Sequence, residues 1–179
     1  MVIVLTGPVH AGKTTFLERA CRRWSERGLS CAGFLSPVVT DANGESGYDL
    51  LELPRGVRRP YLRRRGEPGA EQTGPFAFVT GALERAQSIL RDPGRAGLLV
   101  VDEVGPLELA GGGLWPALRE AVRRPEGTSL LVVRDAIVGE LSAALAPLVP
   151  VVFDVRDPED RRLLEERVLA GLTSHDGQS

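Results

Sequence analysis

A glycine-rich segment near the start of the sequence contains residue types that bind phosphate. Residues 7–14 read Gly-Pro-Val-His-Ala-Gly-Lys-Thr, which is the Walker A spacing G-x-x-x-x-G-K-T. The glycines let the backbone curl until its N–H groups face a triphosphate, and the helix that follows adds the positive end of its dipole. Lys13 can then reach the β- and γ-phosphates, and the Thr14 hydroxyl can bind Mg²⁺. The predicted nucleotide-binding residues are Gly7, Pro8, Val9, His10, Ala11, Gly12, Lys13, Thr14 and Thr15.

The lysine of this segment is exceptional in the composition of the chain. Lysine and arginine together number 22, and Lys13 is the only lysine. Arginine does not easily replace it, because the loop needs a compact point charge rather than a broad planar group. A lysine kept at this one position favours a phosphate-binding loop over a glycine-rich turn without a ligand. It also means that the guanine-specifying pattern N-K-x-D is absent, so the sequence does not indicate a dedicated GTPase.

A second group of chemically active residues follows an apolar run in the middle of the chain. Residues 97–101 lead into Asp102 and Glu103. This is a Walker B pattern, in which a buried parallel strand delivers a carboxylate at its C-terminal end. Asp102 is expected to hold Mg²⁺ together with Thr14, and Glu103 to orient and deprotonate a water molecule that attacks the γ-phosphate. We therefore predict that Lys13, Asp102 and Glu103 are catalytic and that Thr14 and Asp102 bind the metal.

Strand and helix patterns alternate around both motifs and define the expected fold. The alternation around the Walker A loop predicts an α/β protein of the P-loop NTPase class, with a mostly parallel sheet between two helix layers (αβα) and an appended β-hairpin. The acidic residue directly after Asp102 favours the RecA-like branch of this class. We expect one domain over 1–173, with the hairpin at 30–53, an arginine-rich loop at 54–75 and a flexible tail at 174–179. Helices are predicted at 14–27, 76–91, 115–124, 136–148 and 158–172, and further strands at 2–6, 97–101, 128–133 and 149–155.

The roles of the arginine-rich loop and of Arg134 each have two alternatives. The arginine-rich loop is either a mobile lid that offers cations to phosphate or a solvated basic segment. Arg134 follows the strand predicted at 128–133, at the sheet edge where ligands bind. It is either a sensor of the γ-phosphate or an ion-pair partner of Asp135 or Glu140.

Composition excludes several other classes of function. The net charge of −2 gives no sign of a nucleic-acid partner or an acidic membrane surface. No apolar run has the length of a membrane span, and the first strand is too short to be a signal peptide. Cys21 and Cys31 lack the spacing of a metal site and are expected to be packing residues of a cytoplasmic protein. His10 is expected to face solvent.

With these motifs located, the chain resembles the cancer-related nucleoside-triphosphatase family, small P-loop proteins of archaea, bacteria and eukaryotes. The family's distinctive D-E-I-G-K-M-E-L is similar to residues 102–109 here, Asp-Glu-Val-Gly-Pro-Leu-Glu-Leu. The resemblance extends over nearly the whole chain and includes the segments 5–15, 32–34, 47–49, 74–76 and 152–155. It implies slow, Mg²⁺-dependent hydrolysis of the γ-phosphate of several NTPs, and it adds Glu108 as a further acidic candidate. Pro106 stands where the family has a lysine, residues 44–47 lack the family's arginine, and Asp160-Arg161 only approximates its N-R pair.

The sequence therefore predicts a Mg²⁺-dependent nucleoside-triphosphatase that converts ATP and other NTPs to NDP and phosphate. Turnover is expected to be slow, because no arginine finger is evident and such a finger contributes roughly 10³–10⁵ in rate. One alternative is a nucleotide or small-metabolite kinase, in which the arginine-rich segment closes over a phosphorylated acceptor. Another is a nucleotide-controlled switch or adaptor. No feature of the sequence indicates which protein partner it would have.

Overall fold

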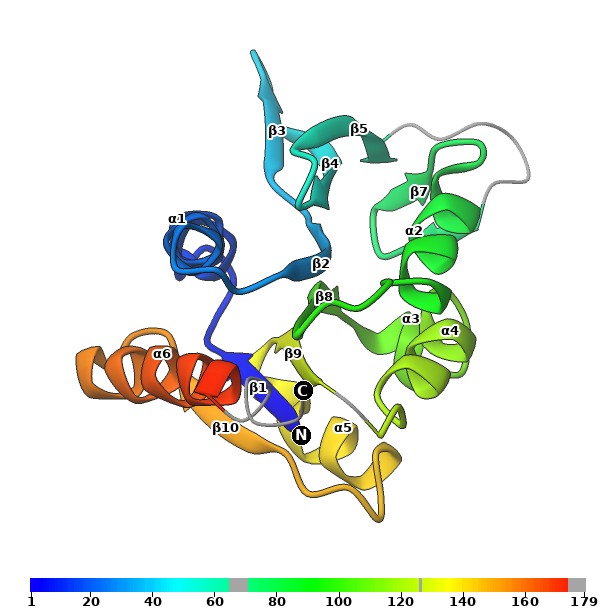
Figure 1. Ribbon diagram of the computed structural model, residues 1–179. Helices are drawn as coiled ribbons and strands as arrows, with labels where there is room; N and C mark the ends of the chain where they lie inside the picture. Colours follow the sequence, from blue (N-terminus) through cyan, green and yellow to red (C-terminus); the bar gives the residue numbers. More distant parts are fainter. Residues whose placement is uncertain (65–70, 126, 174–179) are drawn as a thin grey trace.

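A mixed β-sheet crosses the molecule and carries helices on both faces (Figure 1). The structure, a computed structural model, describes residues 1–64, 71–125 and 127–173. Within these ranges the parallel strands follow the order β10-β1-β9-β8-β2. Their bounds are Val151–Asp154 for β10, Val2–Thr6 for β1, Thr128–Val133 for β9, Leu98–Val104 for β8 and Cys31–Leu35 for β2. One strand, β9, thus separates the strand of the Walker A loop from the strand of the Walker B motif.

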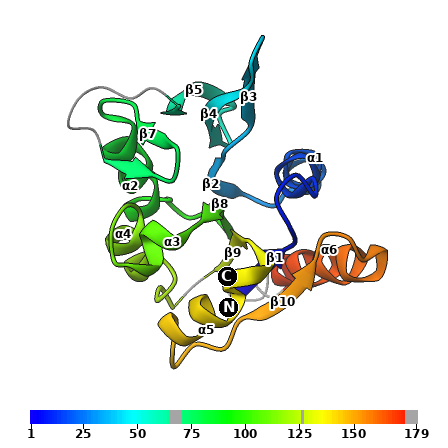
Figure 2. The same cartoon turned by 180° about the vertical axis from the view of Figure 1, so that it is seen from behind.

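The parallel strands β1, β9, β8 and β2 are largely buried on both faces, and this explains their continuous apolar sequences. The edge strand β10 is partly exposed. Val2 and Val4 of β1 point into one core, while Ile3 and Leu5 point into the other. Helices α1 (Lys13–Glu26) and α6 (Pro158–Thr173) cover the second core. Helices α2 (Ala82–Arg91), α4 (Trp115–Ala121) and α5 (Val138–Ala144) cover the first, and both views show the two groups on opposite sides of the sheet (Figures 1 and 2).

The sheet continues beyond β2 as an antiparallel extension. β4 (Gly44–Leu53) pairs with β2 on one side and with β5 (Val57–Arg63) on the other, and β3 (Val38–Asp41) also pairs with β4. β7 (Phe76–Phe78) and the short β6 (Gln72–Thr73) complete the order. The first strand predicted for the hairpin at 30–53 is therefore divided between β2, a strand of the parallel core, and β3.

The prediction of a loop over 54–75 is wrong for the residues that form strands β5 and β6. The arginines of β5 are held by carboxylates of the neighbouring β4. Arg58 and Arg63 donate to Asp49 at 2.8 and 2.6 Å, and Arg59 donates to Glu52 at 3.2 Å. These three arginines of the predicted loop are thus the basic side of a set of cross-strand ion pairs. The rest of the predicted loop, residues 65–70, and the tail at 174–179 lie outside the described residues.

Other differences from the expected elements are local. The helix predicted at 76–91 is strand β7 followed by α2, which begins after Gly81 at φ +74°. The helix predicted at 136–148 is a 3₁₀ turn, η1 (Asp135–Ile137), followed by α5. A one-turn helix, α3 (Pro106–Leu109), follows β8. Cys21 and Cys31 are buried free thiols. In the part of the chain that the structure describes, every helix is too short or too polar to cross a membrane.

Substitution of Gly33 tests the close approach of β2 to β8. A Cβ at Gly33 (φ +102°) would lie 1.9 Å from the Val100 carbonyl oxygen, whereas Gly44 (φ +100°) has no atom within 4 Å of such a Cβ. We expect Gly44→Ala to lower the free energy of unfolding by about 1–2 kcal/mol through backbone strain. Gly33→Ala should lower it by about 1–3 kcal/mol more through the clash. Urea denaturation measures both variants, and equal losses would contradict the close contact.

Candidate active site

The loop between β1 and α1 has the backbone of a phosphate cradle. Gly7, His10 and Gly12 have positive φ angles of 144°, 62° and 84°, which favour glycine at two of these positions. A Cβ at Gly7 would lie 2.9 Å from Cγ1 of Val155. Among the residues that the structure describes, no side chain caps the first turn of α1, so its backbone N–H groups remain available to an anion.

Lys13 lies over this loop and is held by the loop's own carbonyl groups. Its Nζ donates to the carbonyl oxygens of Gly7 and Pro8, each at 2.7 Å. Partial burial lowers the pKa of the ammonium group, while the charges of Glu103 and Asp102 act in the opposite direction. The ammonium is therefore positioned at the mouth of the loop, beside both acidic residues of the second motif.

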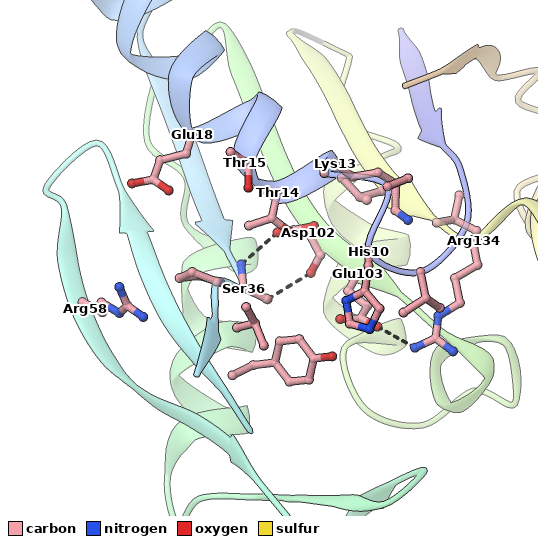
Figure 3. Close-up of a pocket in the computed structure, with 18 residues that line it drawn as sticks. His10, Lys13, Thr14, Thr15, Glu18, Ser36, Arg58, Asp102, Glu103 and Arg134 are labelled. Carbon is pink, nitrogen blue, oxygen red and sulfur yellow. Dashed lines mark hydrogen bonds and ion pairs between the residues drawn. The ribbon is translucent and has the colours of Figure 1, made fainter. Parts of the chain in front are cut away.

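Asp102 is a buried carboxylate at the C-terminal part of β8. Its Oδ2 accepts the backbone N–H of Ser36 at 2.9 Å, and the Ser36 hydroxyl donates to the Asp102 carbonyl oxygen at 3.3 Å (Figure 3). Burial raises the pKa of Asp102 to about 6, although hydrogen bonds from Ser36 and the Thr14 hydroxyl favour the charged form. Figure 3 shows the side chains of Thr14 and Asp102 next to each other in the cavity.

Glu103 reaches the same cavity through an irregular backbone. Its φ is +74°, a conformation that costs a non-glycine residue on the order of 1–2 kcal/mol. It lies where the register between β8 and β9 shifts, between Val101 and Val104. Successive strand residues normally point to opposite faces. The bulge here lets the side chains of both Asp102 and Glu103 line one cavity.

Arg134 is the partner of Glu103. Its Nη2 donates to Oε1 of Glu103 at 3.0 Å, and both side chains are partly exposed (Figure 3). Neither Asp135 nor Glu140, the partners considered from the sequence, makes this ion pair. The contact arises because β8 and β9 are neighbours in the sheet and both end at the site.

The structure brings the predicted residues around one cavity of about 370 Å³. Loop residues 9–15, Asp102 and Glu103 line it, while Gly7 and Pro8 contribute the carbonyl groups that hold Lys13. His10 is largely exposed, with its Nε2 3.7 Å from Oε2 of Glu45. The cavity lies at the C-terminal ends of the parallel strands, where ligands bind in open α/β sheets.

Several lining residues were not among the sequence candidates. Ser36 lies directly after β2, and Tyr48 and Arg58 come from the antiparallel extension. The interruption at Ser36-Pro37 in the predicted strand was the available signal for the first. The other two depend on how β4 and β5 fold over the sheet edge, which no local spacing indicates.

Glu108, the acidic candidate implied by the family resemblance, has a structural role here. Its Oε2 accepts the N–H of Gly105 at 2.9 Å and its Oε1 accepts the N–H of Leu114 at 3.2 Å. It thereby caps α3 and fixes the chain that follows. Burial raises the pKa of its carboxyl group.

Comparison with known proteins agrees with this geometry. Residues 2–169 match the model of the NTPase family. The chain belongs to this family. Within it, a nucleoside-triphosphatase THEP1 of Methanopyrus kandleri is 32% identical over 120 residues, 66% of each chain. The cancer-related nucleoside-triphosphatase homolog of Bos taurus is 31% identical over 139 residues, 72% of each chain.

Solved structures of NTPase family proteins share the fold. The solution structure of a human cancer-related nucleoside triphosphatase covers 97% of both chains with a TM-score of 0.69 at 26% identity. The crystal structure of THEP1 from Aquifex aeolicus covers 95% of this chain and 98% of its own with a TM-score of 0.64 at 21% identity. The family and the α/β fold class predicted from the sequence are confirmed.

The burial of Asp102 predicts a stability that depends on pH. Its pKa of about 6 in the folded chain exceeds the ordinary value of 3.8, so the unfolded chain binds the proton less tightly. The free energy of unfolding should therefore fall as pH rises from about 4 to about 6. Asp102→Asn, which has no charge to bury, should be more stable than the parent by about 2–3 kcal/mol at pH 7, and this advantage should vanish near pH 4.

Urea denaturation in EDTA at both pH values measures this effect. Asp41→Asn is the matched control, because the Asp41 side chain is exposed. A stability difference between Asp102→Asn and the parent that does not change with pH would contradict the prediction.

Proposed function

We propose that this protein is a Mg²⁺-dependent nucleoside-triphosphatase that hydrolyses the γ-phosphate of ATP and other NTPs. The observation that carries the proposal is the convergence of Lys13, Thr14, Asp102 and Glu103 on one cavity at the edge of the parallel strands. The proteins most similar to it that are described above are themselves named nucleoside-triphosphatases. A mixed NTP preference is supported by the absence of the guanine-specifying pattern from the sequence.

Asp102 of β8 and Thr14 of α1 fit a magnesium ion. A hydroxyl and a carboxylate are hard oxygen donors, and Mg²⁺ is usually held by one or two carboxylates together with substrate phosphates. Asp102 and Thr14 provide this pair. Burial disfavours the charged form of the Asp102 carboxylate, and a bound cation would stabilise that form. When bound, the ion would neutralise charge on the β- and γ-phosphate oxygens.

The protein groups divide the remaining work between binding and activation. The loop amides and the N-terminus of α1 would hold the phosphates. Lys13 would exchange the carbonyl oxygens of Gly7 and Pro8 for phosphate oxygens. Glu103, held by Arg134, would orient a water molecule and accept its proton as the oxygen attacks the γ-phosphorus.

Slow turnover is supported by the state of the nearby arginines. Among the described residues, Arg58 and Arg134 are the arginines that line the nucleotide cavity. Each is paired with a carboxylate, Arg58 with Asp49 and Arg134 with Glu103. An arginine that stabilises the transition state contributes roughly 10³–10⁵ in rate, and neither is free for that task. A cytoplasmic location is supported by the free thiols of Cys21 and Cys31.

Glu103→Gln should separate binding from hydrolysis. The amide keeps the size of the side chain but cannot accept the proton of the attacking water. We expect kcat for ATP hydrolysis to fall by about 10²–10⁴, with the Kd for Mg·ATP nearly unchanged. Release of free phosphate and fluorescence titration with a labelled nucleotide measure the two quantities.

Glu159→Gln, at an exposed position of α6, serves as the control and should keep the parental rate. Undiminished phosphate release by Glu103→Gln would remove Glu103 from the mechanism. If the parent released no phosphate from Mg·ATP without an added acceptor, the hydrolase proposal itself would be wrong.

A further inference from the structure

A second cavity lies beside the nucleotide cavity, on the side of the antiparallel extension. Its volume is about 460 Å³, within the range of about 300–1,000 Å³ typical of small-molecule sites. Its aromatic lining comes from Tyr48 of β4, Tyr61 of β5, and Phe76 and Phe78 of β7, and residues around α3 complete it. Figure 1 shows β5, β7 and α3 on the same side of the parallel core.

The aromatic lining is packed and well suited to a planar ring. The rings of Tyr48 and Phe76 meet edge to face with centroids 5.3 Å apart, and those of Tyr61 and Phe78 do so at the same distance. Rings packed in this way hold one another in place. Arg64 lies over the Phe76 ring, 5.1 Å from its centroid. The four rings together give the cavity an aromatic wall against which a planar ligand can pack.

Tyr61 adds a hydroxyl group to this largely aromatic lining. Its side chain is only 4% exposed, and the charges of Glu108 and Glu103 act on it. Burial raises the pKa of Tyr61 well above its usual value, so it is a neutral phenol able to donate to a ligand.

The two cavities share the wall at which the chemistry is proposed. Ser36, Tyr48, Glu103 and Arg134 line both, whereas no residue of the loop at 7–15 lines the second. A group in the second cavity can therefore reach the Glu103 carboxylate without passing the phosphate-binding loop. An in-line nucleophile approaches the γ-phosphorus opposite the β,γ-bridging oxygen, so a phosphate chain held by the loop would leave its γ-phosphorus open to attack from the other side of the site.

The charges of this lining select an uncharged ligand. Glu103 and Glu108 are acidic, and among the described lining residues Arg134 is the only cation. Arg134 is already paired with Glu103. A phosphorylated acceptor of the kind considered from the sequence would find no unpaired cation among the described residues that line this cavity. The arginines of β5 that were expected to bind it are paired with β4. Arg64 donates to the Glu45 carbonyl oxygen and lies over the Phe76 ring.

We propose that the second cavity binds a neutral, planar ring compound carrying a hydroxyl group, and that this hydroxyl can replace water as the acceptor of the γ-phosphoryl group. The inference rests on the nucleotide site of the proposed function. The acceptor oxygen forms a bond to the γ-phosphorus as the bond to the β,γ-bridging oxygen breaks. The electron pair of the broken bond leaves with the nucleoside diphosphate, and Glu103 takes the proton of the hydroxyl. The products are a phosphate monoester and NDP in place of free phosphate and NDP.

The direct test supplies the protein with Mg·ATP labelled in the γ-phosphate and a panel of neutral acceptors. The panel contains nucleosides and hydroxymethyl-substituted heteroaromatic compounds, with nucleoside monophosphates as the anionic comparison. We expect a labelled monoester from at least one neutral acceptor, accompanied by less free phosphate, and none from the monophosphates. Hydrolysis of ATP with no monoester, and no binding of the panel by ligand-observed NMR, would overturn this inference and leave the hydrolase proposal standing. No reaction of ATP at all would count against both.

Two variants test whether the acceptor binds in the second cavity. Tyr61→Phe removes only the hydroxyl and should raise the KM for the neutral acceptor by about two- to tenfold, the equivalent of one hydrogen bond, with little change in the KM for ATP. Thr73→Trp fills the rim of the cavity and should abolish transfer. Thr40→Trp, at an exposed position of β3 outside both cavities, is its matched control. A folded Thr73→Trp protein, verified by circular dichroism, that transfers phosphate with the parental acceptor KM would contradict the assignment.

Discussion

The buried carboxylate of Asp102 is the contact on which the geometry of the site depends. It lies on β8 and accepts hydrogen bonds from the backbone N–H of Ser36, which follows β2, and from the hydroxyl of Thr14 on α1. Three elements are therefore positioned relative to one side chain. Because burial disfavours its charged form, the fold keeps this carboxylate only with the help of these donors and of the Lys13 charge. The Asp102 carboxylate therefore lowers the stability of the folded state, and the same burial and hydrogen bonding position it to bind a cation.

The two halves of the sheet make different contributions. The parallel half ends at one edge and presents the loop, Asp102 and Glu103 there. The antiparallel half lies beside that edge and provides the aromatic side chains of the second cavity and the cross-strand ion pairs. Asp49 and Glu52 of β4 hold the arginines of β5, and Glu52 also binds Arg85 of α2. The Glu52–Arg85 pair joins the extension to α2 of the core, whereas the other pairs join β4 to β5.

The sequence was sufficient where the information is local and insufficient where it depends on register. The phosphate-binding loop and the strand before Asp102 can be recognised from the sequence, because the loop, strand and helix signals of each motif are contiguous. The pairing of Arg134 with Glu103 joins residues 31 positions apart and follows only from the adjacency of β8 and β9. The strand at Phe76–Phe78 was assigned to a helix, since a short apolar run does not distinguish the two. Partners of the β5 arginines could not be read without the antiparallel register of β4 and β5.

The bulge at Glu103 shows how the site departs from regular structure. The positive φ angle would suit glycine or asparagine better than glutamate. It occurs at the register shift between β8 and β9, beside a carboxylate that must share the same cavity. Strained backbone of this kind persists where the surrounding structure over-determines it, and here β9 and Arg134 do so.

The single lysine has a practical consequence for the chemistry of the whole chain. Apart from the N-terminal amine, which contacts the carbonyl of Gly127, the protein offers amine-reactive reagents one target, and it lies in the loop. Partial burial lowers the pKa of that amine, which increases the fraction present as the free base. Covalent labelling and occupation of the phosphate site are therefore mutually exclusive events at one nitrogen atom. Ordinary acylation chemistry becomes a site-directed probe without any engineered residue.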